Sequence, residues 1–367
     1  MAGFVERNAR KEIFRLKPYV PGKPIEEVKR ELGVEDVIKM ASNENPLGAS
    51  PRAREAIQAM LDDLHIYPDS NCYYLKQKLA AKYEYGAENF IIGNGSDELL
   101  RLIAETFISP EDQVIFGHPS FAEYEFMTMI MGGGCQAVKL ADFKYDLPAI
   151  QAAITESTKI VYICNPNNPT GTIVSRQEIE DFMAGLRDDV LVVFDEAYYE
   201  YVADPLYQSG LEYLERGHNV IVLRTFSKIY GLAALRIGYG ITTPEIAEAV
   251  NRVREPFNVN SLAQAAAAAA LDDTEHLKRS RELNQQGKEY LYQEFEKMGL
   301  SYVPTETNFI FVDTGRDCQE VFQQLLPQGV IVRTGDIFGY PTSIRVTIGS
   351  QTENQRFIEN LKRILED

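Results

Sequence analysis

The chain has 367 residues, more than one compact core usually contains, so we expect two packed units and exclude a single small module. Its 37 Lys and Arg residues stand against 54 Asp and Glu residues, and the formal net charge of −17 argues against nucleic acid or an anionic membrane as its main partner. Hydrophobic residues at 45% and charged residues at 25% are ordinary globular values, which excludes disorder and a fibrous repeat. We therefore expect small-molecule partners.

The cysteines and the N-terminal segment indicate the cellular compartment in which we expect the protein. The four cysteines lie far apart and form no C-x-x-C pair, so no zinc site, other metal site or redox motif is predicted. The first 20 residues mix charges and contain no apolar core of a signal peptide, and no stretch approaches 18 uncharged apolar residues. We expect a reduced, cytoplasmic protein.

The N-terminal part of the chain predicts an arm. Residues 16–24, LKPYVPGKP, are a proline-rich extended segment, and residues 28–33, VKRELG, end a short helix with glycine. We expect residues 1–45 to form an arm that packs with the small C-terminal domain.

The middle of the chain predicts a large α/β domain over residues 46–255. Short β-branched apolar runs alternate with longer amphipathic stretches, and such runs suit strands buried between two helix layers. The pattern predicts a three-layer α/β/α domain with a mostly parallel sheet. The runs are residues 90–92, 114–116, 137–140, 160–164, 190–194, 220–223 and 236–241.

The last third predicts a smaller unit. Residues 245–298 have helical character, including the alanine run 265–270, and we assign residues 256–298 to connecting helices. Apolar strand-like runs at 308–313, 330–335 and 343–349 then alternate with helical segments. Residues 299–367 are therefore expected to form a small α+β domain.

A glycine-rich turn follows the first apolar run. Gly93-Asn94-Gly95-Ser96-Asp97-Glu98 leads into a helical pattern, and Ser96 or Asp97 can cap that helix. Free N–H groups and the helix dipole favour an anion such as a phosphate there, and an ordinary capped turn is the alternative. The turn matches neither the dinucleotide fingerprint nor the Walker loop.

Polar residues follow the next buried runs, where ligands of open α/β sheets bind. The rigid turn Asn165–Gly171 presents an asparagine amide, and Asp195 and Tyr198 follow residues 190–194. A carboxylate leaving so apolar a strand is costly unless it pairs with a cation. Capping of the next helix is the alternative role for Asp195.

After residues 220–223 come Thr225, Ser227 and Lys228, with Arg236 eight residues further on. This combination suits a Schiff base beside a phosphate, and a solvated surface lysine is the alternative. Thr225-x-x-Lys228 lacks the partner motifs of a serine hydrolase, and the four histidines are scattered. A lysine, a strand-end aspartate, a tyrosine, an amide and a phosphate cradle together form the set that pyridoxal phosphate needs.

With these residues in place, the chain resembles the fold-type I pyridoxal-phosphate aminotransferases, and within them the histidinol-phosphate aminotransferases. The resemblance covers nearly the whole chain. It is carried by LKPYVPGKPIEEV, ASNENPLG, YPDSNCYYLKQKLA, GNGSDELL, HPSFAEY, NPNNPTG, VFDEAYYEY, TFSKIYGLAALRIGYG, PFNVNSLAQAA, TETNFIFV, VRTGDIFG and SIRVTIG.

The resemblance implies a pyridoxal 5'-phosphate cofactor and a role for each matching residue. Lys228 would form the Schiff base and move the proton, Asp195 would pair with the pyridinium nitrogen, Tyr198 and Asn168 would bond the ring oxygen, and Phe121 would stack on the ring. The residues implied at the cofactor phosphate are Gly95, Ser96, Asp97, Thr225, Ser227 and Arg236.

The resemblance also implies a homodimer with shared active sites, because Tyr67 would reach the phosphate of the other subunit. For Phe121 and Tyr67, an ordinary core or interface aromatic is the alternative. Arg345 would hold the substrate carboxylate of small anionic substrates, and Tyr19, Asn43 and Arg333 would shape the substrate end.

The implied activity is ping-pong transamination between L-histidinol phosphate and 2-oxoglutarate, giving imidazole acetol phosphate and glutamate, in histidine biosynthesis. An arginine fork can pair bidentately with a carboxylate or a phosphate, as both substrates require. Residues 340–343 depart from the usual loop of relatives. The alternatives are an aromatic amino acid aminotransferase, a threonine-phosphate decarboxylase and a non-catalytic cofactor-binding protein, and the intact Lys228, Asp195 and Arg236 favour catalysis.

Overall fold

The structure is a computed structural model that describes residues 3–16 and 22–366. Its larger unit is built on a seven-stranded sheet of order β2-β8-β7-β6-β5-β3-β4. β8 runs antiparallel to both neighbours and the other pairings are parallel, which confirms the mostly parallel sheet. The strands are β2 (Phe90–Gly93), β3 (Gln113–His118), β4 (Gly134–Lys139), β5 (Thr158–Cys164), β6 (Leu191–Asp195), β7 (Val220–Thr225) and β8 (Gly238–Ile241).

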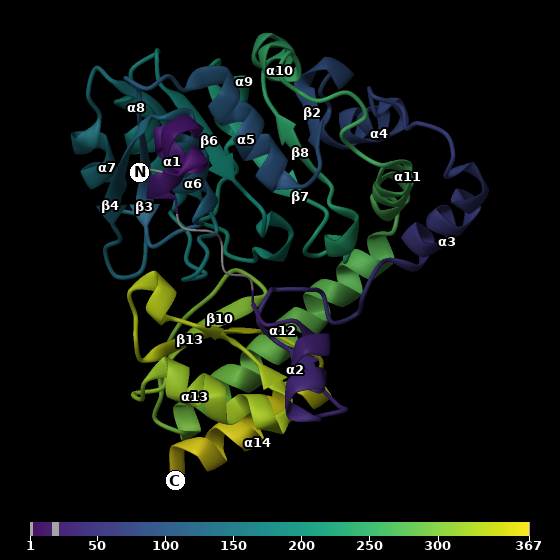
Figure 1. The fold of residues 1–367 in the computed structure, drawn as a ribbon, viewed down its shortest axis with the longest axis vertical. Helices are drawn as coiled ribbons and strands as arrows, with labels where there is room; N and C mark the ends of the chain where they lie inside the picture. The colour runs from purple at the N-terminus through teal and green to yellow at the C-terminus, as the bar shows by residue number, and fades with distance from the viewer. Residues whose placement is uncertain (1–2, 17–21, 367) are drawn as a thin grey trace.

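Helices surround this sheet in the upper half of Figure 1. Every residue of β6 and β7 is buried, so helices must cover both faces, as the apolar runs predict. The helices are α3 (Pro51–Ala59), α4 (Tyr73–Tyr83), α5 (Ser96–Phe107), α6 (Glu123–Met131), α7 (Leu147–Ala153), α8 (Arg176–Ala184), α9 (Leu211–Glu215), α10 (Pro244–Asn251) and α11 (Ser261–Ala270).

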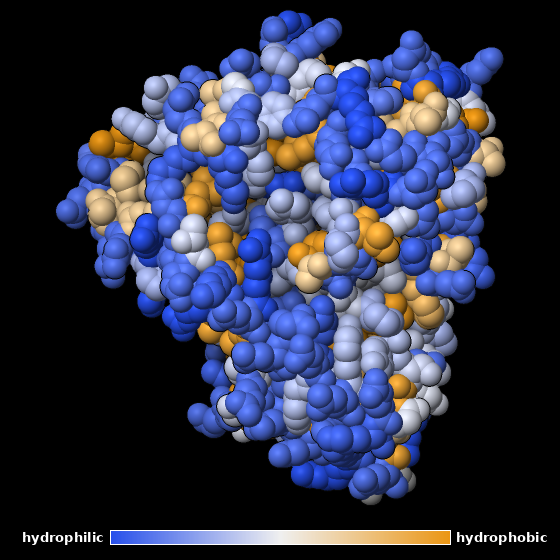
Figure 2. All heavy atoms as spheres, turned by 180° about the vertical axis from the view of Figure 1, so that it is seen from behind, coloured by the Kyte–Doolittle hydropathy of each residue, from blue (hydrophilic) through white to orange (hydrophobic). Residues whose placement is uncertain are grey.

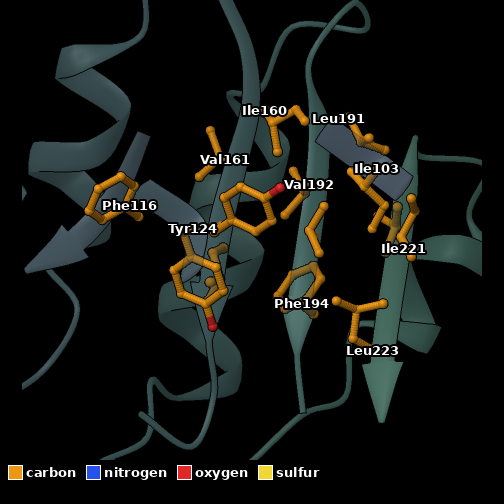
Figure 3. Packing of buried hydrophobic residues seen from close by; sticks show 14 of the residues in the cluster. Ile103, Phe116, Tyr124, Ile160, Val161, Leu191, Val192, Phe194, Ile221 and Leu223 are labelled. Atoms are coloured by element: carbon orange, nitrogen blue, oxygen red, sulfur yellow. The ribbon is translucent and has the colours of Figure 1, made fainter. Parts of the chain in front are cut away.

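The core of this unit consists mainly of β-branched residues on the central strands. Figure 3 shows Val161, Val192 and Ile221 on three neighbouring strands and Tyr124 of α6 in the same core, and all four are fully buried. Removing one such aliphatic side chain from water contributes about 1.5–3 kcal/mol. The packed strands therefore hold their carboxyl ends, which carry the polar residues, at fixed positions.

The smaller unit lies below in Figure 1 and is reached by the long helix α12 (Thr274–Lys297). Its antiparallel sheet has the order β12-β13-β10-β9. Its elements are β9 (Ser301–Val303), β10 (Phe309–Asp313), α13 (Cys318–Leu325), β12 (Arg333–Thr334), β13 (Ser343–Thr347) and α14 (Gln351–Glu366). The unit has the expected α+β character, while the boundaries at residues 255 and 299 stay predictions.

Residues 330–335 form two short strands instead of one. β11 (Val330–Ile331) pairs in parallel with β1 (Ile38–Lys39), whereas β12 pairs with β13. The chain thus changes sheets within a few residues, because the N-terminal segment supplies a partner for its first half. Sequence periodicity does not report such a change of partner.

The N-terminal segment divides between the two units. α2 (Ile25–Leu32) ends at Gly33 with a φ of 67°, and Val28 packs with Leu326 and Ile331 of the small unit. In contrast, α1 (Phe4–Asn8) is followed by the 3₁₀ turn Lys11–Arg15, which lies near α6, and Arg10 donates to the carbonyl of Ile130 there. The expectation that all of residues 1–45 pack with the small domain is wrong for residues 10–15, because Arg10 binds a free carbonyl in the last turn of α6 and the following 3₁₀ turn lies near that helix.

The outer surface is mainly hydrophilic, and Figure 2 shows apolar groups mostly in the upper half and around the middle of the rear face. Within the described residues, no helix has the length and apolar character needed to span a membrane. The remaining short 3₁₀ helices are Leu61–Asp63, Ala87–Asn89, Tyr199–Tyr201, Ala233–Leu235, Leu326–Gln328 and Asp336–Phe338.

Candidate active site

A cavity of about 380 Å³ lies where the carboxyl ends of β5, β6 and β7 face β12 and β13. This volume is in the range that accommodates a small molecule. The predicted site residues that line it are Asn43, Ser96, Asp97, Phe121, Asn168, Asp195, Tyr198, Thr225, Ser227, Lys228, Arg236, Arg333 and Arg345. The structure thus brings together residues that are up to 302 positions apart, from Asn43 to Arg345 (345 − 43 = 302).

Lys228 follows β7 and extends its amine into this cavity. Its Nζ donates to the carbonyl of Ser42 at 3.1 Å and lies 5.8 Å from the ring centre of Tyr198. Burial and, next to it, the positive charge of Arg345 together lower the pKa of Lys228 to about 8. A larger fraction of this amine is therefore unprotonated near neutral pH than in an exposed lysine, as a nucleophile or proton acceptor requires.

Asp195 is the last residue of β6 and is 4% exposed. Its Oδ2 accepts a hydrogen bond from the Tyr124 hydroxyl at 2.7 Å, and its Oδ1 accepts from the Ala197 N–H at 3.2 Å. Burial raises the pKa of Asp195 to about 6, although both hydrogen bonds act in the opposite direction. The expected protein cation is absent: within residues 3–16 and 22–366, no ion pair joins Asp195 to a lysine or arginine.

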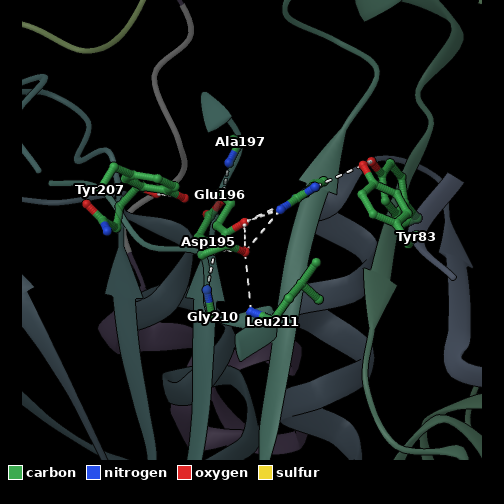
Figure 4. Close-up of polar contacts among 11 residues, drawn as sticks. Tyr83, Asp195, Glu196, Ala197, Tyr207, Gly210 and Leu211 are labelled. Carbon is green, nitrogen blue, oxygen red and sulfur yellow. Dashed lines mark hydrogen bonds and ion pairs between the residues drawn. The ribbon is translucent and has the colours of Figure 1, made fainter. Parts of the chain in front are cut away.

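The arginine instead pairs with the next residue, Glu196. Its Oε2 lies 2.7 Å from Nη2 and 3.1 Å from Nε of Arg224, and both side chains are 1% exposed. Figure 4 shows Glu196 bonded to this guanidinium and to the N–H of Gly210, with Asp195 alongside. Sequence reasoning missed this pair, although Arg224 stands one strand away from two adjacent acids.

Two asparagine amides form hydrogen bonds in this part of the cavity, that of Asn43 with Tyr198 and that of Asn168 with Arg345. Asn43 Nδ2 donates to the Tyr198 hydroxyl at 2.9 Å, so the phenol keeps its own proton as a donor. The Oδ1 of Asn168 accepts from Nη1 of Arg345, which leaves the NH₂ group of Asn168 as its donor end. Burial raises the pKa of Tyr198 well above its ordinary value, so this phenol stays protonated. An acceptor oxygen of a bound ligand would meet two donors here, the Tyr198 hydroxyl and the NH₂ group of Asn168.

The glycine-rich turn approaches Arg236 closely. Gly95 has a φ of 84°, and a Cβ at this position would lie 2.7 Å from Arg236 Nη2. Arg236 has a φ of 52°, a strained conformation for a residue with a side chain, and pairs with Asp97 at 2.9 Å. Gly95 is therefore needed so that the start of α5 and a guanidinium can share one anion-binding region.

The predicted side-chain cap of α5 is wrong. Gly95, which has no side chain, is the N-cap residue instead of Ser96 or Asp97. The carboxylate of Glu98, in the first turn of α5, accepts a hydrogen bond from the N–H of Asn94 at 2.6 Å. This side chain thus provides the backbone N–H of the preceding turn with a partner. In the other predicted phosphate turn, Thr225 Oγ1 accepts from the N–H of Ser227 at 3.0 Å.

Comparison with known proteins identifies the family. The profile for aminotransferase class I and II matches residues 35–361. The chain belongs to this aminotransferase family. The histidinol-phosphate aminotransferase of Moorella thermoacetica is 59% identical over 97% of this chain and 92% of its own length. That of Caldicellulosiruptor saccharolyticus is 51% identical over 97% of this chain and 99% of its own.

Solved structures confirm the α/β fold with a mostly parallel central sheet. The crystal structure of histidinol-phosphate aminotransferase from Sinorhizobium meliloti in complex with pyridoxal-5'-phosphate superposes with a TM-score of 0.90 at 28% identity. The superposition covers 98% of each chain. The suggested resemblance to pyridoxal-phosphate aminotransferases is therefore confirmed at the level of the family and the fold.

The residues of this aminotransferase cavity fit pyridoxal phosphate. Lys228 offers an amine to an aldehyde, Asp195 a carboxylate to a protonated ring nitrogen, and Tyr198 a phenol to a ring oxygen. A Cβ at Gly95 would extend into the space between the start of α5 and Arg236. The N–H groups of the helix and the guanidinium border this space, and both kinds of group bind phosphate. The roles of the individual residues stay predictions.

The substrate end of the cavity in this aminotransferase carries two arginines. Arg333 of β12 and Arg345 of β13 are direct cross-strand partners, and both line the cavity. Arg345 is 7% exposed, and its Nη2 donates to the Ala41 carbonyl at 2.7 Å. Guanidinium groups that line a cavity bind carboxylate and phosphate groups, often bidentately. The arrangement therefore favours an anionic substrate group.

Among the predicted site residues that the structure describes, Gly95 and Tyr67 do not line this cavity. Tyr67 is 80% exposed and stacks on Phe257 with ring centres 4.8 Å apart. It lines a separate surface hollow with Leu64, Ile66 and Pro256. Tyr19 lies outside the described residues.

Several residues that line or support the cavity were not among the predicted site residues, including Ser42, Glu123, Tyr124 and Cys164. Glu123 and Cys164 line it, Ser42 receives the Lys228 amine, and Tyr124 binds Asp195. Tyr124 could have been found, since it stands three residues after Phe121 at the start of a helical pattern. Ser42 carries no sequence signal, because it acts through its backbone carbonyl.

Proposed function

We propose that the chain catalyses ping-pong transamination between L-histidinol phosphate and 2-oxoglutarate, using pyridoxal 5'-phosphate, in histidine biosynthesis. The observation that carries the proposal is the convergence of Lys228, Asp195 and the cross-strand pair Arg333 and Arg345 on one cavity. Relatives that are 59% and 51% identical to the chain are histidinol-phosphate aminotransferases, which supports this substrate.

When bound, pyridoxal phosphate supplies an electron sink for negative charge at the substrate carbon that carries the amine. Lys228 would hold the cofactor, and its Nζ would then accept the proton from that substrate carbon and deliver it to the cofactor carbon that carried the aldehyde. Its lowered pKa of about 8 suits this exchange, because a base works best near the operating pH. Asp195 holds the ring nitrogen in its protonated form, and Tyr198 and Asn168 donate to the ring oxygen.

The remaining predicted cofactor residues would bind pyridoxal phosphate and orient its ring. Phe121 covers the ring face. The phosphate is held by the turn before α5 and by the residues after β7, namely Gly95, Ser96, Asp97, Thr225, Ser227 and Arg236. The dipole of α5, a helix of 12 residues, adds to the attraction.

The two arginines would select substrates. Arg345 pairs with the carboxylate of glutamate in one half-reaction, and Arg345 and Arg333 together receive the phosphate ester in the other. A guanidinium can bind either anion bidentately, which allows one pocket to serve both. Asn43 and Tyr19 would complete this end of the pocket.

We also infer a cytoplasmic homodimer with shared active sites. Tyr67 and Phe257 form an exposed apolar stack with Leu64 and Ile66 beside it, and such patches mark interfaces. Tyr67 would then reach the cofactor phosphate of the partner subunit. All four cysteines are free thiols, as is usual in a reducing compartment.

Spectroscopy and kinetics test the function. Purified protein mixed with pyridoxal phosphate should develop a visible absorbance band, and borohydride should fix the cofactor to the peptide that contains Lys228. The value of kcat/KM should be higher for histidinol phosphate than for phenylalanine or threonine phosphate. A colourless protein would contradict the cofactor proposal, and a clear preference for phenylalanine would indicate an aromatic aminotransferase instead.

The dimer is tested separately by sedimentation of the purified protein. A dimer is expected, and Tyr67→Phe should weaken cofactor binding while the dimer persists. Tyr74→Phe is the matched control, because Tyr74 is equally exposed at 80% and has no proposed contact with the cofactor. A monomer that binds and turns over normally would contradict shared active sites.

A further inference from the structure

Tyr124 contacts two residues that face the cofactor position from different directions. Its hydroxyl donates to Asp195 Oδ2 at 2.7 Å, and its ring meets that of Phe121 edge to face, with centres 5.8 Å apart and planes at 83°. Asp195 and Phe121 come from different elements, the end of β6 and the segment before α6. One side chain therefore connects the predicted partner of the ring nitrogen to the predicted partner of the ring face.

The surrounding core fixes the orientation of this phenol. Tyr124 is fully buried and stacks on Tyr162 of β5, with ring centres 4.6 Å apart and planes at 7°. Figure 3 shows Tyr124 among the side chains of the central strands. A ring held between two aromatic neighbours can place its hydroxyl at one point, where it meets the Asp195 carboxylate.

Asp195 depends on this hydroxyl more than on any other side chain. Across residues 3–16 and 22–366, Tyr124 supplies the one side-chain hydrogen bond to its carboxylate, and the other donor is the backbone N–H of Ala197. The carboxyl is buried, and the negative charges of Asp97 and Glu196 oppose its ionisation. A hydrogen bond to the charged form acts against both effects. Without that bond, a larger fraction of Asp195 would be neutral at pH 7.

A neutral Asp195 would be a poor partner for a protonated ring nitrogen. An ionised carboxylate has about four acceptor positions, so two bonds from the protein leave room for a third donor from a ligand. A protonated carboxyl offers a donor of its own in place of one acceptor. The hydrogen bond from Tyr124 thus favours the form of Asp195 that the cofactor needs.

We propose that Tyr124 is a positioning residue that orients Asp195 and keeps it ionised toward the ring nitrogen of the cofactor. This role rests on the proposed function, because it assumes that pyridoxal phosphate binds in the cavity. Tyr124 acts through Asp195 and through the ring of Phe121, without touching the substrate.

Tyr162 provides a matched control. Its ring is the stacking partner of Tyr124 and is equally buried, and its hydroxyl is buried without a hydrogen-bond partner in the described part of the chain. Tyr124→Phe and Tyr162→Phe each remove one buried hydroxyl from the same stack. Only the first removes a contact with Asp195.

The first measurement is the affinity of apoprotein for pyridoxal phosphate at pH 7, followed by absorbance. Loss of a hydrogen bond to a charged group should raise the dissociation constant about tenfold or more in Tyr124→Phe, and Tyr162→Phe should stay within about twofold of wild type. The pH below which affinity falls should also move upward in Tyr124→Phe alone. Equal effects of the two substitutions, or an unchanged Tyr124→Phe, would overturn the proposal.

A double-mutant cycle tests whether Tyr124 acts through Asp195. In an Asp195→Asn background, Tyr124→Phe should cause little further loss of affinity, because the carboxylate that it supports is gone. Full additivity of the two losses would overturn the positioning role. If wild-type protein bound no pyridoxal phosphate, the proposed function would fail together with this inference, whereas a normal wild type with an unaffected Tyr124→Phe would overturn only the inference.

The pH profile must be read with the other titratable groups around Asp195. The charges of Asp97 and Glu196 act on Asp195, Cys164 lies opposite it on β5, and Lys228 shares the cavity. The phenols nearby are Tyr124, Tyr162 and Tyr198. All of these groups except Tyr124 are the same in wild type and Tyr124→Phe, so a difference between their profiles reports the loss of this hydroxyl.

Discussion

Asp195 and Glu196 are neighbours in the chain, and both are buried, with 4% and 1% exposed. Glu196 lies in a closed region, where Arg224, Ser209 and the N–H of Gly210 occupy its carboxylate. Asp195 lies in an open region, the cavity, where a phenol and one N–H bind it and, within the described residues, no cation neutralises it. One buried charge is paired inside the protein, and the other faces a cavity that can admit a ligand.

The comparison distinguishes structural charges from functional ones. Isolated buried charges are unfavourable, so a fold retains them where a partner or a ligand balances them. Arg224 balances Glu196, and a protonated ring nitrogen would balance Asp195. Position at a strand end does not separate these two cases, because both residues follow the same apolar run.

The largest effect is expected at the functional amine. Lys228→Ala should lower kcat for transamination by about 10²- to 10⁴-fold, since it removes the group that moves the proton. Lys82→Met is the control, because Lys82 is also buried in part but donates to the Tyr230 hydroxyl outside the cavity. Single-turnover absorbance measures both variants. Comparable activity in Lys228→Ala and wild type would remove the assignment.

Breaking the buried ion pair between Glu196 and Arg224 should lower the free energy of unfolding the most. Glu196→Gln leaves the Arg224 charge buried without a counter-charge and should lower the free energy of unfolding by about 3–5 kcal/mol. Glu248→Gln removes the partner of Arg252 in a pair whose side chains are 75% and 70% exposed, and should cost less than about 1 kcal/mol. Urea denaturation measures both. Equal costs would contradict the distinction between a buried and an exposed pair.

Substrate recognition should suffer next. Arg345→Lys keeps the charge but loses the planar fork, so kcat/KM for glutamate and for histidinol phosphate should fall about 10- to 100-fold. Arg316→Lys is the control in the same unit, since Arg316 binds the carbonyls of Ile364 and Leu365 at the end of α14. Unchanged kinetics in Arg345→Lys would refute a bidentate role.

The smallest expected effect is a change in the free energy of unfolding in Asp195→Asn, and its sign is opposite to that expected for Glu196→Gln. The native pKa of Asp195 is raised to about 6, above the unfolded value of about 3.9, so its contribution to stability is present below pH 4 and is lost as the pH rises through 6. Asp195→Asn should therefore match wild type in stability only below pH 4 and be the more stable apoprotein above it. This advantage should grow by about 1–2 kcal/mol between pH 5 and pH 8. A loss at pH 8 like that of Glu196→Gln would mean that Asp195 is also a structural charge.

The sequence alone predicted the elements that depend on local pattern. The β-branched runs that became β5, β6 and β7 form buried strands because few other structures bury both faces of so short a segment. Since parallel strands present their carboxyl ends at one edge, Asp195 and Lys228 were expected to lie in the same region. The cavity does contain both side chains.

The tertiary structure decided which side chains meet. Tyr124 binds Asp195 across 71 residues, Arg224 binds Glu196 instead of Asp195, and Arg10 contacts α6 across 120 residues instead of the small domain. These choices depend on distances of a few ångströms between segments that are remote in the chain, and residue type does not encode such distances. Sequence pattern determined where polar groups leave the sheet, and packing of the complete fold determined which of them were neutralised and which were left facing the cavity.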